Sequence, residues 1–329
     1  MLDPLLQVDA PSNTESLVAL ADYAAAHAIE SASALAAARD CLIEALARAF
    51  EALRAPRGAA LIGPLVPGAL MPGGARVPGT SLELDPAQAA FCTGLMLCRA
   101  ASGSQREALP SGRAADPIAA ILAVADYQAR KAIMEGKPPP KVRDVLGAII
   151  KALEIQDGLM GSARIAATVI VTAQLGGAPG QIFLALSYAG TDGGMPVGAA
   201  ESQHDIQRED WARAHAMSHA VRCACQAMAA SPSSHPTSLD LAADLAGKFL
   251  GAMFAAPRKP FGTEVIGRLA RLRKPQDAIE LAMRFQTAVA RCFPARQAER
   301  IKALFAYPDR LDDLPVNELV AALVTNGSR

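Results

Sequence analysis

Residues 62–96 read IGPLVPGALMPGGARVPGTSLELDPAQAAFCTGLM, and this stretch decides how the whole chain is interpreted. Its first half belongs to a segment, residues 56–81, with five prolines and six glycines, a composition that predicts no regular structure. Loops of this length inside a compact domain are uncommon and usually functional. Asp85 and Pro86 then provide the N-cap and first-turn residues that typically start a helix. The stretch therefore predicts a long irregular loop that leads into a helix.

Apolar residues at helical spacing predict helices on both sides of this stretch. Upstream, Ser12 and Glu15 form a capping box that starts one helix, and a second helix is expected at about 31–53. Downstream, helical patterns cover residues 118–134, 142–155, 165–175, 179–189 and 210–230, with a second glycine-rich loop at 190–207. The predicted core comprises Leu42, Leu46, Phe50, Phe91, Leu95, Ile121, Val124, Ile149 and Val169.

The sequence SPSSHP at residues 231–236 is the clearest linker candidate, so we expect a helical domain at 1–230 and a second part at 231–329. Helical patterns recur in the second part, whereas a stretch at 261–272 is compatible with either a short strand or a helix. The helical stretches there are residues 239–253, 275–289 and 315–324.

Composition excludes several classes of function. The chain of 329 residues carries 32 basic and 32 acidic side chains, so nothing provides the basic surface that nucleic-acid binding requires. Six cysteines occur without a Cys-x-x-Cys pair, which favours buried thiols in a reducing compartment over a metal site or disulfides. The sequence starts without a secretory signal, and its apolar runs are shorter than the roughly 18 residues that span a bilayer. We therefore expect a cytoplasmic protein with neither a nucleic-acid nor a membrane partner.

A series of short motifs follows a known family in order and spacing. The motifs are Arg76–Thr80, Leu84–Phe91, Ile121–Asp126, Arg143–Leu146, Ile150–Gln156, Trp211-Ala212 and Ala220–Arg222. Together they resemble the MmgE/PrpD family, and its 2-methylcitrate dehydratase branch in particular, over roughly residues 15–225. The resemblance implies a mainly α fold, a large all-helical domain with a smaller α/β lid, and a homodimer. It also implies a hydro-lyase that acts on a small tricarboxylate without a cofactor. Because only about 100 residues follow the linker, we expect residues 231–329 to form a reduced lid remnant and C-terminal helices.

The chain departs from the family pattern where the chemistry is expected. Dehydration of a β-hydroxy acid requires a base, an acid and cationic groups that hold the carboxylates. The family's R-W-L-D-F-N-D segment corresponds here to RAASGS at 99–104, and its G-H-P-S-D-N segment to GRAADP at 112–117. Only Asp116 survives from the second segment, with Arg113 in place of the histidine. Elsewhere Leu153 and Ile279 replace histidines. In the family's R-K-S-W-A-x-G-D-A motif, Glu209 replaces the lysine and Ala214-His215 replaces the Gly-Asp pair. Several acid–base and charged groups are therefore missing together.

Two functional interpretations follow from this pattern. In the first, the chain is a lyase of the 2-methylcitrate dehydratase type with impaired catalysis, in which Asp116 is the catalytic residue and Arg76, Arg113 and Lys151 contact substrate carboxylates. In the second, it is a catalytically degenerate member that acts as a binding or assembly module. No residues are assigned to a cofactor or a metal; His215 and His219 have the i, i+4 spacing of a ligand pair, but solvated histidines are the preferred interpretation.

Overall fold

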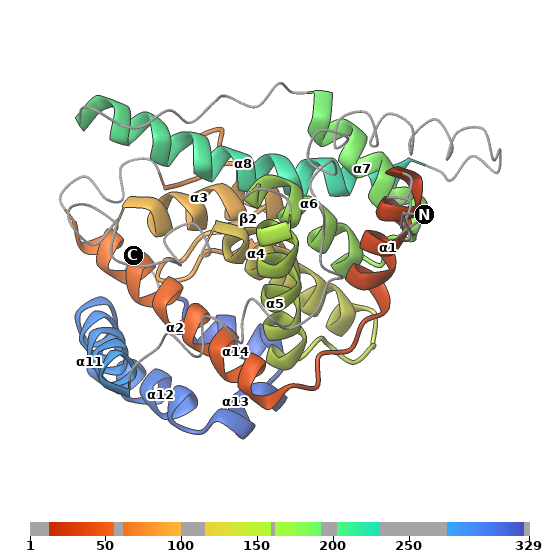
Figure 1. The fold of residues 1–329 in the computed structure, drawn as a ribbon. Helices are drawn as coiled ribbons and strands as arrows, with labels where there is room; N and C mark the ends of the chain where they lie inside the picture. The colour runs from red at the N-terminus through yellow and green to blue at the C-terminus, as the bar shows by residue number, and fades with distance from the viewer. Residues whose placement is uncertain are drawn as a thin grey trace, which may run out of the picture.

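The computed structural model describes residues 13–55, 62–99, 116–158, 162–191, 203–230 and 275–325 (Figure 1). Within these ranges regular structure is almost entirely helical, which confirms the mainly α fold class. The first part contains α1 (Asn13–Ala26), α2 (Ala32–Arg54), α3 (Pro86–Arg99), α4 (Asp116–Met134), α5 (Val142–Gly158), α6 (Ala163–Gln174), α7 (Pro179–Thr191) and α8 (Gln203–Ala229). The last part contains α11 (Pro275–Cys292), α12 (Ala295–Ala306), α13 (Pro308–Asp313) and α14 (Val316–Ala322).

Helix α8 runs across one side of the molecule, at the top of Figure 1, and packs against α3, α4, α6 and α7. Alanine is frequent among the buried residues of these helices, and small side chains allow helix axes to approach closely. Eight of the nine predicted core residues are buried. The exception is Phe91, which is only partly buried and lies edge-on to Trp211 at 6.0 Å between ring centroids.

The described part of the predicted irregular segment, residues 62–81, contains one short regular element. Strand β1 (Ala75–Arg76) pairs antiparallel with β2 (Glu83–Leu84), with Ala75 opposite Leu84. The expectation of no regular structure across 56–81 was therefore wrong at β1. A two-residue ladder depends on pairing across a turn, which composition alone does not reveal. Arg130 of α4 secures this hairpin by donating to the carbonyl of Gly74 and to the carboxylate of Glu83.

Most helix boundaries follow the sequence signals. Asp85 caps α3 as predicted, because its Oδ1 accepts from the backbone N–H groups of Ala87 and Gln88. Three features differ from the prediction. Helix α8 begins at Gln203, inside the glycine-rich loop expected over 190–207. Helix α4 begins at Asp116 itself, whose carboxylate is bound by α8. Helices α12 and α13 were not among the predicted elements.

The described part of the second predicted domain, residues 275–325, is helical and packs on the first part. Helix α11 lies against α2, where Arg284 forms an ion pair with Glu51, and Arg39 of α2 forms a bidentate pair with Asp312 of α13. Residues 231–274, including the predicted linker, the helical pattern at 239–253 and the ambiguous stretch at 261–272, lie outside the described residues. The division at residue 230 and the reduced lid therefore stay predictions.

Two helix-interior glycines provide a matched test of this packing. A Cβ at Gly94 of α3 would lie 3.2 Å from the Cα of Ala214 in α8, whereas a Cβ at Gly147 of α5 would meet only Ile29, at 3.9 Å. Alanine has the higher helix propensity, so we expect Gly147→Ala to raise the free energy of unfolding by about 0.4–1 kcal/mol. We expect Gly94→Ala to lower it, because overpacking costs about 1–3 kcal/mol. Urea denaturation would measure both, and equal effects would contradict the close approach of α3 and α8.

Candidate functional site

Asp116 lies at the start of α4 and is held by Arg213 of α8 in a buried, bidentate ion pair. The Nε of Arg213 donates to Oδ2 at 2.9 Å, and Nη2 donates to Oδ1 at 2.5 Å. Asp116 is only 6% exposed. Both oxygens of the one surviving acid–base candidate thus accept hydrogen bonds from a guanidinium, an arrangement with strong geometric preference. Arg113 lies outside the described residues.

Arg213 lies among acidic groups on three helices. Burial alone would lower the pKa of Arg213, but charge interactions with Cys98 and Asp116, hydrogen bonds to Asp116 and the charge of Glu209 outweigh it and raise that pKa above its usual value. The guanidinium is therefore permanently charged and cannot exchange a proton at neutral pH. Arg213 is a residue that the sequence analysis missed, because it occupies an unspecified position of the family's R-K-S-W-A-x-G-D-A motif.

His215 does not join this pair. It is two residues beyond Arg213 on α8, about 200° around the helix, and it is exposed. Its ring stacks on Trp211 with 4.9 Å between centroids and lies 6.3 Å from His219. His219 in turn contacts the thiol of Cys223 at 3.6 Å. Among the residues that the structure describes, no group of three or more His, Cys, Asp or Glu side chains is arranged to hold a metal ion.

Arg76 lies elsewhere, on β1. Its guanidinium donates to both oxygens of Asp126, at 3.1 and 2.5 Å, and to the carbonyl of Asn317 in α14 at 2.7 Å. Asp126 is fully buried and also accepts from the backbone N–H of Arg76. Because Asp126 is ten residues along α4 from Asp116, the two carboxylates are about 15 Å apart along the helix axis. These contacts give Arg76 a role in joining β1, α4 and α14.

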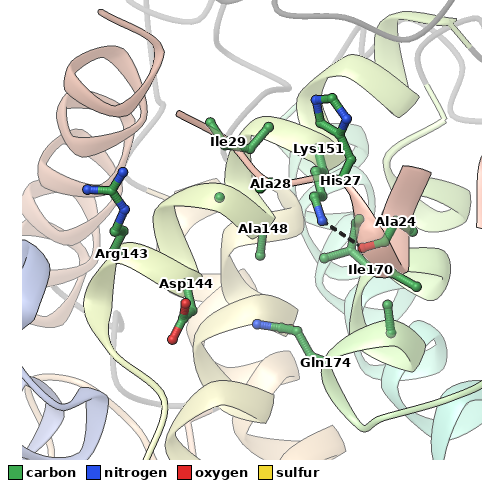
Figure 2. Close-up of a pocket in the computed structure, with 13 residues that line it drawn as sticks. Ala24, His27, Ala28, Ile29, Arg143, Asp144, Ala148, Lys151, Ile170 and Gln174 are labelled. Atoms are coloured by element: carbon green, nitrogen blue, oxygen red, sulfur yellow. Dashed lines mark hydrogen bonds between the residues drawn. The ribbon is translucent and has the colours of Figure 1, made fainter. Parts of the chain in front are cut away.

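Lys151 lines a third location, a pocket between α1, α5 and α6 (Figure 2). Its Nζ donates to the carbonyl of Ala24 near the end of α1 at 2.8 Å, and burial lowers the pKa of the ammonium. Neither Asp116 nor Arg76 lines this pocket. The three described site candidates therefore occupy separate places in the fold.

One turn beyond Lys151, Glu154 is a buried carboxyl that the sequence analysis did not identify. It is 3% exposed, its Oε2 accepts a hydrogen bond from the hydroxyl of Tyr23, and its Oε1 is buried without a described partner. Burial raises the pKa of Glu154 to about 7. The residue belongs to the Ile150–Gln156 motif, but only the packing of α1 over α5 creates its environment.

Comparison with known proteins relates the chain to one family. Residues 18–168 match the MmgE/PrpD N-terminal domain. The 2-methylcitrate dehydratase of Cupriavidus necator is 36% identical over 221 residues, which is 63% of this chain and 46% of that protein. The enzyme of Escherichia coli K12 is 35% identical over the same shares, and the mitochondrial enzyme of Yarrowia lipolytica is 34% identical over 66% of this chain and 45% of its own length. The chain thus matches slightly less than half the length of these relatives.

Within the described ranges, no helix is both long enough and apolar enough to cross a membrane.

The Asp116–Arg213 pair should be strongly coupled in stability. We expect Asp116→Asn and Arg213→Met each to lower the free energy of unfolding by about 3–5 kcal/mol, since each leaves a buried charge without its partner. The double variant should lose less than the sum, with a coupling energy above about 1 kcal/mol by chemical denaturation. A cycle at the more exposed Glu299–Lys302 pair is the control, where the coupling should stay below about 1 kcal/mol. Equal couplings in both cycles would contradict the assigned burial.

Glu154 should make stability depend on pH. Its pKa rises from 4.5 in the unfolded chain to about 7 in the folded protein, so the folded state retains a proton that the unfolded state loses. The stabilisation that Glu154 contributes to the free energy of unfolding is complete below pH 4.5. As pH rises to about 7 it is lost, and the free energy of unfolding falls by up to about 3 kcal/mol. Chemical denaturation across this pH range should show that the free energy of unfolding depends less on pH in Glu154→Gln than in the unmodified protein. The exposed control Glu299→Gln should keep the pH dependence of the unmodified protein. An unchanged slope in Glu154→Gln would be inconsistent with the raised pKa.

Proposed function

We propose, from the match of residues 18–168 to the MmgE/PrpD N-terminal domain, that this chain acts on a small tricarboxylate as a 2-methylcitrate dehydratase-like protein with impaired catalysis. The similarity to 2-methylcitrate dehydratases supports the substrate class and the hydro-lyase type of reaction. Because the chain matches less than half the length of those enzymes, the activity of the whole protein is part of the proposal.

The observation that supports impaired catalysis is the bidentate ion pair between Asp116 and Arg213. A general base must come within hydrogen-bond reach of the proton that it removes. Here each carboxylate oxygen of Asp116 is engaged by the guanidinium, and the residue is 6% exposed. To act on a substrate, Asp116 would have to leave this pair and strand a buried charge, which typically costs several kcal/mol.

Local charge also opposes a bound tricarboxylate. The transition state of dehydration accumulates negative charge that cationic groups must stabilise. Arg213 is instead balanced by Asp116, and Glu209, which contributes to its raised pKa, stands where family members carry a lysine. Binding would bring a substrate carboxylate near the Glu209 carboxylate, and both negative charges would lose water. Because these like charges repel each other, binding of the substrate is weakened as well as turnover.

A second candidate, a catalytically degenerate binding or assembly module, is favoured by the same pair together with the substitutions at Leu153, Glu209 and His215. Under either candidate we retain a homodimer, a cytoplasmic location and a connection to propionate catabolism as parts of the proposal, each supported only by family similarity. Arg76, Arg113 and Lys151 remain proposed carboxylate contacts, although Arg76 is already engaged by Asp126.

A direct assay separates these possibilities. The assay follows the absorbance of unsaturated product from 2-methylcitrate and from citrate, with a bona fide dehydratase as the reference. We expect no turnover, or a rate lower than that of the reference enzyme by several orders of magnitude. This expectation follows because each missing acid–base group typically contributes about 10²–10⁴-fold. Asp116→Asn should leave that low rate unchanged. Ordinary enzymatic turnover that is lost in Asp116→Asn would show that Asp116 is a working catalytic residue and that the impairment is wrong.

A further inference from the structure

A cavity of about 330 Å³ between α1, α5 and α6 is lined by Lys151 but by neither member of the Asp116–Arg213 pair. It lies at the end of α1 and is lined on one side by Lys151 and on another by Gln174, with Arg143 at the far edge (Figure 2). Much of the remaining lining is small, so the cavity is not filled by side chains; it includes Ala24, Ala25, Ala28, Gly147, Ala148 and Ala173.

Lys151 is a partly buried cation without a described anionic partner. An ammonium has three donors, and the one hydrogen bond found for Lys151 is to the Ala24 carbonyl. No carboxylate among the described residues lies within ion-pair distance of it, and desolvation is the one cause that lowers its pKa. Removing a charge from water without pairing it is costly, so the two donors that Lys151 has left favour an anion in the cavity that it lines.

Gln174 provides a second group at the cavity. Figure 2 shows its side-chain amide nitrogen, a hydrogen-bond donor, directed across the pocket. It comes from α6, whereas Lys151 comes from α5, so the two donors approach the cavity from different helices. Donors from two helices suit a ligand whose oxygens accept hydrogen bonds.

The remaining charges at the cavity are mainly basic. His27 and Arg143 lie at its edge, and Asp144 is the one carboxylate in its lining. Asp144 is already used locally, because its Oδ2 accepts a hydrogen bond from the backbone N–H of Lys141 at 2.8 Å. Arg143 and Lys151 therefore leave the lining with an excess of positive charge. A volume of about 330 Å³ lies at the small end of ligand sites, which span about 300–1,000 Å³.

We propose that this cavity binds a small oxyanion, a carboxylate or a phosphate, whose charged oxygen pairs with the Nζ of Lys151 while the side-chain amide nitrogen of Gln174 donates a hydrogen bond to a second ligand oxygen. The site is separate from the Asp116–Arg213 pair and does not depend on dehydratase activity. Its ligand class follows from an ammonium with unused donors, a neutral amide donor and a small apolar floor.

Isothermal titration calorimetry with citrate and, separately, inorganic phosphate tests this site on the full chain. Lys151→Met removes the charge, and Ala148→Leu fills the cavity while leaving Lys151 in place. Lys151→Met should weaken binding by about tenfold or more, since a charge-assisted hydrogen bond contributes at least that much. Ala148→Leu should weaken binding to a similar degree, because its side chain occupies the space that the ligand needs. Lys131→Met, at an exposed lysine of α4, is the matched control and should bind as the unmodified protein does.

The outcomes separate the anions and the sites. Binding of both ligands would indicate a general oxyanion site, and binding of citrate alone would indicate selection for carboxylates. The proposal is overturned if neither anion binds with a Kd below about 1 mM. It is equally overturned if affinity is unchanged in Lys151→Met or in Ala148→Leu, or if affinity is lost in Arg213→Met but kept in Lys151→Met. Circular dichroism of each variant ensures that lost affinity is compared between folded proteins.

Discussion

The buried ion pair between Asp116 and Arg213 joins the first residue of α4 to the middle of α8, and the arrangement of the surrounding helices depends on it. One residue beyond Arg213, Ala214 lies against Gly94 of α3, so the pair is made where α3, α4 and α8 meet. A charge pair in such a place is maintained only when both partners are satisfied, because either charge alone would be costly to bury. The same contact therefore constrains the packing of the core and the chemistry available to Asp116.

Under the proposed function, this constraint explains how a fold similar to that of 2-methylcitrate dehydratases is combined with a weakened reaction. Arg213 binds both carboxylate oxygens of Asp116, and the pair joins α4 to α8. A carboxylate engaged in this way is not available to move a proton. Arg76 shows the same tendency, since its guanidinium joins Asp126 to α14. Polar groups that the family resemblance associates with carboxylate recognition are, in this chain, engaged in holding helices together.

The helical fold was largely readable from the sequence, because apolar periodicity and caps such as Asp85 are local signals. Strand β1 was missed because its pairing with β2 is not local. The site was less predictable. Asp116 was identified from its motif, but its partner Arg213 lies 97 residues away at a position that the motif leaves unspecified. The raised pKa of Glu154 likewise arises from burial beneath α1, which no spacing within α5 encodes.

Under the proposed function, Asp116 does not act as a base because Arg213 holds it. Proton NMR of 2-methylcitrate incubated with the protein in deuterium oxide tests this most directly, since a working base exchanges substrate hydrogens next to a carboxylate even when no water is eliminated. If Arg213 holds Asp116 in this way, no exchange above the protein-free rate is expected. Exchange that is fast with the unmodified protein and absent with Asp116→Asn would contradict it.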